Sequence, residues 1–389
     1  MKWFGKFKKY ELKILLVSSM LLLIFSSYYF LEVTKLKNQV LDMIKTLSET
    51  QKELNILKNQ DQLKINEQLK IDIKKTHDAY IQIIKPYEKI QDLKAQKQDV
   101  KDLEKTYAGI LQYLSDLNYS SSSALLTQLN KDIDKKYSAL AAAQTATAPS
   151  QTVTASNIPP GSGYSFQAVK TANGTFNVAI IAADLNSTRV IIDTASDSDC
   201  SNNCPVLSLG DYVARSGAYA GINGPFFCPA EYPSCAGKTN SFDTLLMNKN
   251  KHYFNSDNNK YSTVPLVYFN GNTMGVRGQS LEWGRDTGVD SVVANFPLYI
   301  SGGNNNFGGS SDPKINSVGT RTFVANKGNF AYIGIVYNAS AAQTASVLKA
   351  LGMENALGLD QGGSTALWFN GYKAGPGRAL PSALLFVRK

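Results

Sequence analysis

Arginine is absent from the first 160 residues of this 389-residue chain, and glycine occurs there only twice, as Gly5 and Gly109. All seven arginines and the other 27 of the 29 glycines lie in residues 161–389. Because tight turns depend on glycine, its scarcity argues against a turn-rich β-domain in the first part. The 23 lysines there favour long helices instead, whereas the second part has the composition of a globular domain that contains strands.

Histidine and cysteine are also scarce. Of two histidines, only His252 lies in the second part, in a Lys/Asn-rich loop that we expect to face solvent. The cysteines form two local sets whose spacings are not the C-x-x-C of zinc sites, so we expect no metal and no cofactor. An even number of cysteines in an exported domain predicts two disulfides, with three pairings open. The candidates are Cys200, Cys204, Cys228 and Cys235.

The net charge of +9 belongs mostly to the N-terminal part, which contributes +6 against +3 from residues 161–389. This distribution does not indicate a nucleic-acid-binding face on the globular domain. The glycine-rich segment 301–309 lacks the Gly-Lys-Ser/Thr of a nucleotide-binding loop. We expect it to be a mobile loop over a site.

Residues 14–31 form an uncharged run of 18 residues, close to the length that crosses a bilayer as a helix. Five lysines precede the run and three follow closely, which places residues 1–13 in the cytoplasm as a basic tail and all later residues outside. A cleaved signal peptide is the alternative, but the run is long for one and no small-x-small pattern follows it. The sequence therefore predicts a single-pass membrane protein with an extracytoplasmic C-terminal domain.

Residues 32–140 have the apolar spacing of long helices, and residues 141–162 read as a flexible, uncharged linker. The helices predict either a coiled-coil stalk that forms homo-oligomers or amphipathic helices packed as a bundle, and the pattern does not choose between them. Pro86 is expected to kink or stop a helix.

Residues 163–389 predict an α+β domain with a mixed sheet and few helices. Asn173-Gly174 between two strand-like runs indicates a hairpin. Ser208 with Asp211, and Ser340 with Gln343, have the spacing of helix capping boxes.

Polar residues that an apolar core does not explain cluster in a few segments of this domain. Asn223 and Gly224 end a strand, Arg321 enters one, and Asp360 ends an apolar run. The remaining polar segments are the proline-containing strand 296–303, the turn of Gln361, Gly362, Gly363, Ser364 and Thr365, and the closing segment with Arg378.

In this order the segments resemble the phosphodiester glycosidase domain family. The family pattern is roughly Asn-Gly-x-Phe-Phe, a Pro-containing strand ending in Gly, Arg-Thr, Leu-Asp-Gly-Gly-Gly-Ser and a closing Arg. The match covers residues 163–389 but not the anchor or the helices. Two departures are Pro225 inside the first motif and Gln361 where the family usually has glycine.

The resemblance implies a hydrolase that cleaves the glycosidic bond of sugar 1-phosphodiesters in envelope or extracellular glycans. It implies Asp360 as nucleophile or general base at C1, with Arg321 and Asn223 as further catalytic residues. A second carboxylate would have to be a residue such as Glu282 or Asp243. Either Arg321 or Arg378 would bind the phosphate. The implied substrate-binding residues are Gly224, Gln361, Gly362, Gly363, Ser364, Thr365 and Arg378.

Other interpretations of the sequence stay open at this point. The domain can be a non-catalytic module that binds phosphoglycans at a distance set by the stalk, and Gln361 beside the carboxylate favours that interpretation. The protein can instead be a structural envelope protein whose coiled coil recruits partners. Separately, the acidic loop of Asp193, Asp197 and Asp199 half resembles a calcium loop but lacks its glycine and closing glutamate.

Overall fold

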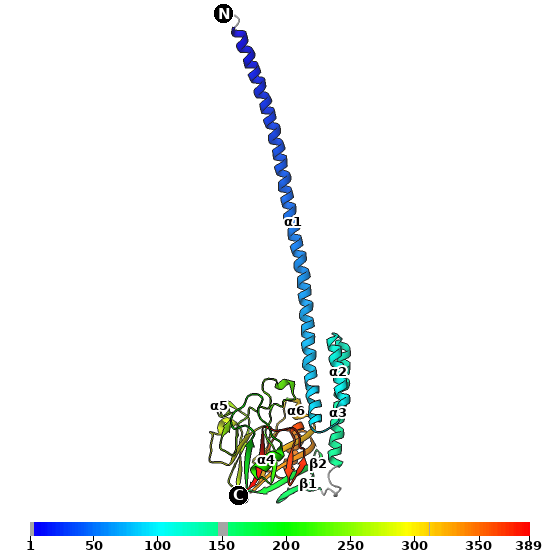
Figure 1. The fold of residues 1–389 in the computed structure, drawn as a ribbon, viewed down its shortest axis with the longest axis vertical. Helices are drawn as coiled ribbons and strands as arrows, with labels where there is room; N and C mark the ends of the chain where they lie inside the picture. The colour runs from blue at the N-terminus through cyan, green and yellow to red at the C-terminus, as the bar shows by residue number, and fades with distance from the viewer. Residues whose placement is uncertain (1–3, 147–154, 311) are drawn as a thin grey trace. The chain divides into compact units, whose positions relative to one another are not determined.

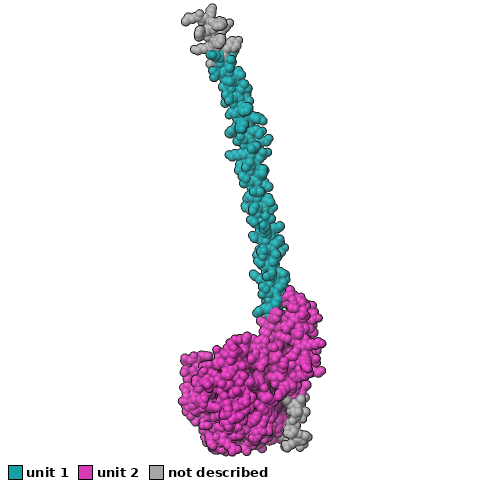
Figure 2. Space-filling model, in the orientation of Figure 1, with its two compact units in different colours: residues 1–77 teal, residues 78–389 magenta. Residues whose placement is uncertain are grey.

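The computed structural model describes residues 4–146, 155–310 and 312–389. The chain divides into two compact units, residues 1–77 and residues 78–389 (Figure 2). Parts of the predicted tail and linker, residues 1–3 and 147–154, lie outside the described residues.

A single helix, α1 (Phe4–Ala95), contains the uncharged run, the first apolar seam and Pro86. The helix therefore continues through Pro86 and does not stop there. Its run near the N-terminus is exposed, and it is apolar and long enough to cross a membrane by length and composition. The seam residues Val33, Leu36 and Val40 are exposed as well.

The end of α1 packs with α2 (Lys101–Ser115) and α3 (Tyr119–Ala146) around an apolar core. Figure 1 shows α2 and α3 side by side. The buried residues recur at helical spacing in all three helices, as expected for amphipathic helices; they include Ile83, Ile90, Leu93, Leu103, Ile110, Leu114, Leu129 and Ile133. Residues 83–140 thus pack as a bundle, one of the two arrangements that the sequence left open.

The largest sheet of the C-terminal domain has seven strands in the order β1-β2-β13-β12-β14-β10-β11. Alternate residues of β2 face two different cores: Ile181 lies in one, and Val178 and Ile180 lie in the other, beside the helix α7 (Ala341–Ala350). The strands are β1 (Gly163–Thr171), β2 (Gly174–Asp184), β10 (Leu298–Ser301), β11 (Asn304–Asn305), β12 (Gly319–Lys327), β13 (Phe330–Ala339) and β14 (Asn355–Gly358).

Two five-stranded sheets cover the first core from the other side. One has the order β16-β15-β4-β17-β3, with β3 (Thr188–Thr194), β4 (Ala220–Asn223), β15 (Leu367–Phe369), β16 (Tyr372–Ala374) and β17 (Ser382–Arg388). The other has the order β6-β5-β9-β7-β8, with β5 (Leu246–Met247), β6 (Tyr253–Phe254), β7 (Leu266–Asn270), β8 (Thr273–Arg277) and β9 (Ser291–Ala294).

All strand pairings within these three sheets are antiparallel, so the expected mixed sheet is wrong. Strand-like runs in a sequence do not reveal direction, and direction follows from the connections. The α+β class itself is confirmed. The remaining short helices are α4 (Leu209–Ser216), α5 (Asn258–Tyr261), α6 (Pro313–Asn316), η1 (Pro233–Cys235), η2 (Ser280–Glu282) and η3 (Gly362–Ser364).

Local sequence signals hold where the structure tests them. The hairpin of β1 and β2 closes at Thr171 and Gly174. Ser208 and Asp211 form a capping box for α4, and Ser340 and Gln343 form one for α7. Each box satisfies amide groups at a helix start that would otherwise lack partners.

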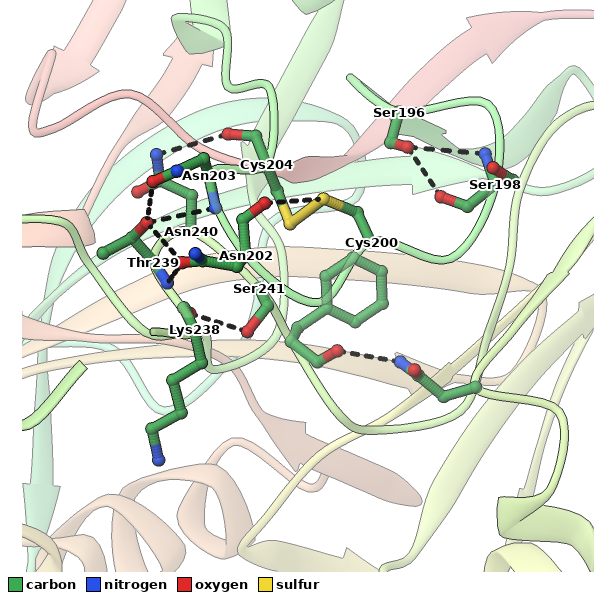
Figure 3. Close-up of a disulfide and its surroundings, with 12 residues drawn as sticks. Ser196, Ser198, Cys200, Asn202, Asn203, Cys204, Lys238, Thr239, Asn240 and Ser241 are labelled. Carbon is green, nitrogen blue, oxygen red and sulfur yellow. Dashed lines mark hydrogen bonds between the residues drawn. A yellow bond between two sulfur atoms is a disulfide. The ribbon is translucent and has the colours of Figure 1, made fainter. Parts of the chain in front are cut away.

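The four cysteines form two local disulfides, Cys200–Cys204 and Cys228–Cys235. Figure 3 shows the first of them beside the segment that follows the second. The amide of Thr239 donates to the side chain of Asn202 at 2.9 Å. The two disulfide-bearing segments therefore support one another, and the predicted count of two is confirmed.

Candidate active site

Asp360 follows β14 and lies where the large sheet meets the sheet of β4. Its backbone amide donates to the carbonyl of Gly224 at 3.1 Å. Its backbone carbonyl accepts hydrogen bonds from the Thr322 hydroxyl on β12 and from the Asn223 side-chain amide at 2.7 Å. The carboxylate is thus carried by a backbone that is fixed from two sheets.

Asn223, at the end of β4, is fully buried. Its Nδ2 donates to the carbonyl of Asp360, and its Oδ1 accepts from the amide of Ala366 at 3.2 Å. Both ends of its side chain therefore bind the backbone on either side of the Asp360 turn. The structure places Asn223 at the predicted site, in a position that shapes the turn.

Gly224 lies against β17 with no room for a side chain. A Cβ atom there would come within 2.3 Å of the Ser382 hydroxyl and 2.8 Å of the Ser382 carbonyl oxygen. Distances this short are far inside van der Waals contact, and the second atom belongs to the backbone. A larger residue would have to displace the strand that borders Asp360.

Gly224→Ala should therefore lower the free energy of unfolding by about 1–3 kcal/mol, the range typical of overpacked sites. Chemical denaturation of the full chain in detergent measures this change. Gly278→Ala is a matched control, because nothing lies within 4 Å of a Cβ at that position. Equal losses in the two variants would contradict the steric explanation.

Arg321 on β12 is buried, and carbonyl oxygens surround its guanidinium. Its Nε donates to Ala339 at 3.0 Å, Nη2 donates to Ile315 at 3.0 Å and to Ser317, and Nη1 donates to the Gln361 side chain. Burial lowers the pKa of Arg321. The structure joins Arg321 to the Asp360 turn through Gln361, the residue that departs from the family pattern.

Arg378 is the guanidinium nearest to the glycines of the turn. Its amide donates to the carbonyl of Gly363 at 2.9 Å, and a Cβ on Gly363 would lie 2.4 Å from Arg378 Nη2. The Tyr232 ring lies under the guanidinium, 5.1 Å from ring centroid to Cζ. Burial disfavours the charge, but Asp92, Tyr232 and Asp360 more than compensate, so the pKa of Arg378 is raised.

Burial raises the pKa of the Asp360 carboxyl to about 7. The Ser364 hydroxyl, the Arg378 guanidinium and the amide of Gln361 act in the opposite direction and limit the rise. A carboxyl with this pKa changes its protonation state near neutral pH. Such a group can act as a base or nucleophile once it is ionised.

Two buried polar atoms of the segment that carries Arg378 have no hydrogen-bond partner among the described residues. They are Nε of Arg378 and the hydroxyl oxygen of Ser382. Buried polar atoms without partners are rare in folded proteins and call for an explanation, such as a catalytic role or a bound water or ion. Ser382 is a residue that sequence reasoning missed, because a serine at the start of a strand carries no signal of its own.

The remaining predicted residues are placed as follows. Thr365 lies in the same turn, with its hydroxyl 3.2 Å from that of Thr320. Glu282 and Asp243, the proposed second carboxylates, are exposed, whereas Asp360 is buried. The carboxylate that does lie at the site is Asp92 of α1, 2.5 Å from Arg378 Nη2. Asp92 lies outside the family resemblance, and no motif in the sequence marks it.

Two further candidates from the sequence are the acidic loop and the glycine-rich loop. Asp193 is buried and paired with Arg215 at 2.7 Å and Lys249 at 2.9 Å, so two protein cations already neutralise it. The glycine-rich loop borders a cavity of about 290 Å³ with Phe296, Pro297 and Phe307 in its wall. His252 is exposed, as expected.

Comparison with known proteins finds a match to one family model and several solved structures with a similar fold. The structure is similar to the crystal structure of a hypothetical protein from Synechocystis, with 13% identity, a TM-score of 0.41 and coverage of 58% of this chain and 62% of that one. It is also similar to the catalytic domain of zebrafish N-acetylglucosamine-1-phosphodiester alpha-N-acetylglucosaminidase, with 13% identity and a TM-score of 0.45. This match covers 61% of this chain and 87% of the zebrafish chain. A third similar structure is that of a putative exported protein from Burkholderia pseudomallei, with 12% identity and a TM-score of 0.35. This match covers 55% of this chain and 74% of the Burkholderia chain.

The chain spans less than two thirds of the Synechocystis protein. No curated protein matches the sequence. The family model for phosphodiester glycosidases matches residues 216–387, a range that contains Asn223, Arg321, Asp360 and Arg378. Residues 216–387 thus match a phosphodiester glycosidase domain.

Proposed function

We propose that the C-terminal domain hydrolyses the glycosidic bond of sugar 1-phosphodiesters, with Asp360 as the reacting carboxylate and Arg378 as the phosphate-binding residue. The observation that carries the proposal is the buried Asp360 carboxyl, whose pKa burial raises to about 7, near the buried Arg378 guanidinium. The family match supports a carbohydrate substrate. An acid and a cation buried together suit a substrate that carries both a sugar and a phosphate.

The phosphate is the part of the substrate that Arg378 suits. A guanidinium is planar and permanently charged, and it can donate two parallel hydrogen bonds to phosphate oxygens. Arg378 Nε is a buried donor that has no hydrogen-bond partner among the described residues. Arg321, by contrast, already donates to Ala339, Ile315 and other oxygens. Arg321 is therefore a positioning residue in this proposal, acting on Asp360 through Gln361.

The chemistry breaks the bond between C1 of the sugar and the phosphate oxygen. The electron pair of that bond leaves with the phosphate, which becomes a phosphomonoester. Asp360 either attacks C1 and forms a glycosyl ester that water then cleaves, or removes a proton from a water that attacks C1 directly. A phosphate is a weakly basic leaving group, so it needs less protonation than the alkoxide of an ordinary glycoside.

The direct test is to incubate the detergent-solubilised full chain with a panel of sugar 1-phosphodiesters and to measure free sugar. Release from at least one member supports the proposal. Proton NMR of the first anomer formed would separate the two roles of Asp360, because a glycosyl ester gives retention and direct attack gives inversion. Absence of release, with tight binding of the same compounds, would favour the non-catalytic module.

The pH dependence follows from the raised pKa of Asp360. As a nucleophile or base, Asp360 must be ionised, so kcat/KM should rise with pH and level off above about 7. Initial rates measured from pH 5 to pH 9, values chosen around that pKa, would show the curve. A rate that falls as pH rises through 7 would mean that Asp360 acts as a general acid.

We also propose that the apolar N-terminal part of α1 anchors the protein in a membrane, with the domain on the extracytoplasmic side. The helix is long and apolar enough by composition, and the two disulfides fit an oxidising compartment. The exposed seam of Val33, Leu36 and Val40 supports self-association of α1 as a coiled coil. Carbonate extraction of membranes and labelling of the C-terminal domain from outside intact cells would test the anchor and its orientation.

A further inference from the structure

The candidate site is closed by a residue from outside the family domain. Asp92 lies in the last turn of α1, and its Oδ1 accepts a hydrogen bond from Arg378 Nη2 at 2.5 Å. The Asp92 side chain is 18% exposed and that of Arg378 only 6%. The guanidinium proposed to bind substrate phosphate is therefore already paired with a carboxylate of the same chain.

Asp92 also lies over the glycines of the Asp360 turn. A Cβ on Gly363 would be 2.9 Å from Asp92 Oδ1, and a Cβ on Gly362 would be 3.4 Å from Asp92 Oδ2. The carboxylate thus occupies the space beside two residues without side chains, with Arg378 on its other side. An anion with oxygens at this position has the contacts that a bound phosphate would require.

The preceding turn of α1 is held by a second contact. Glu88 lies four residues before Asp92, so both side chains project from one face of the helix. The Glu88 carboxylate, which is buried, accepts a hydrogen bond from the Ser234 hydroxyl. Ser234 and Tyr232, the ring under Arg378, both belong to the loop closed by the Cys228–Cys235 disulfide.

We propose that Asp92 holds the place of the substrate phosphate on Arg378, and that the last turns of α1 must withdraw before a sugar phosphodiester binds. This inference rests on the proposed function in one respect, which is that Arg378 binds the phosphate. A phosphodiester carries a negative charge, so it cannot share Arg378 with the Asp92 carboxylate without strong repulsion in a buried site. The helix and the substrate therefore compete for one cation.

The test measures binding and not turnover, so it is independent of whether hydrolysis occurs. Inorganic phosphate is titrated into the full chain, wild type and Asp92→Asn, by calorimetry in detergent. The variant should bind phosphate at least tenfold more tightly, because the competing charge is gone. Asp134→Asn is the matched control: Asp134 lies on α3 in an exposed pair with Lys89 and should leave the affinity unchanged. Unchanged or weaker binding in Asp92→Asn would overturn the inference.

A second measurement covers the case in which Asp92→Asn does not fold. Hydrogen–deuterium exchange of the wild-type chain is compared with and without a saturating concentration of inorganic phosphate. Exchange at residues 88–95 should rise severalfold with phosphate, while exchange in α2 stays the same. Equal protection of residues 88–95 in both conditions would show that phosphate does not displace the helix. If phosphate binds and displaces the helix but no diester is hydrolysed, this inference stands and the proposed function fails.

Discussion

Asp360→Asn should reduce the hydrolysis of sugar 1-phosphodiesters by about a thousandfold or more, the scale seen when a reacting group of an active site is removed. The asparagine has nearly the same shape, and its Oδ1 can still accept the hydrogen bond that the Gln361 amide gives to Asp360 at 2.9 Å. It cannot attack C1 or remove a proton from water. Rates of sugar release under saturating substrate would measure the loss.

The same variant should be more stable than the wild type at alkaline pH. The folded state raises the pKa of Asp360 from 3.8 to about 7, so it binds the proton more tightly than the unfolded chain does. The stability gained from this proton is complete below the unfolded pKa and is lost as pH rises through about 7. Asparagine mimics the protonated form at every pH. Its advantage should therefore approach zero at low pH and reach roughly 4 kcal/mol in alkaline solution.

Thermal melts of the variant and the wild type at acidic and alkaline pH would check the sign of this stability difference. A variant that keeps full turnover would remove Asp360 from the mechanism. A variant that unfolds at every pH would mean that the carboxylate serves the fold and not the chemistry. Asp243→Asn is a suitable control, because Asp243 is an exposed aspartate of the same domain.

Arg378→Gln should have the second large effect, on both activity and stability. Loss of the phosphate-binding guanidinium should lower kcat/KM by about a hundredfold, as the loss of one buried charge-stabilising group does in other enzymes. The substitution also leaves Asp92 largely buried without its cation, which should lower the free energy of unfolding by roughly 2–4 kcal/mol. Steady-state kinetics and chemical denaturation measure the two effects separately.

The double variant Asp92→Asn with Arg378→Gln separates these effects further. It removes both charges of the pair, so it should regain most of the lost stability. It should stay as poorly active as Arg378→Gln, because it still lacks a cation for the phosphate. Recovery of activity in the double variant would show that Arg378 serves only to neutralise Asp92.

The sequence predicted the parts of the site that depend on local signals. The glycines after Asp360, the end of β4 at Asn223 and the two capping boxes are visible because turns and caps restrict which residues fit. The ordered motifs also brought Arg321 and Arg378 into consideration. The structure shows that Arg378 is the arginine near Gly363. The sequence alone cannot show this, because it depends on how β17 and the preceding loop pack against the turn.

Other parts could not be predicted for physical reasons. The strands β6, β8, β9 and β16 are short, and short runs do not show a period that separates strand from loop. The direction of the sheets follows from connections that no single run reveals. Asp92 looks like any other charge on a solvated helix, and only the packing of residues 78–389 as one unit brings it to Arg378.

The loop between Cys228 and Cys235 carries two groups that interact with the end of α1: Tyr232 interacts with Asp92, and the Ser234 hydroxyl bonds Glu88. A covalent ring of this kind limits the conformations available to its residues. In a reducing environment the ring would open, and the surface that receives Glu88 would lose its fixed shape. Thiol oxidation would then be a condition for α1 to be held in place, and newly made chains would keep an uncovered site until their cysteines had paired.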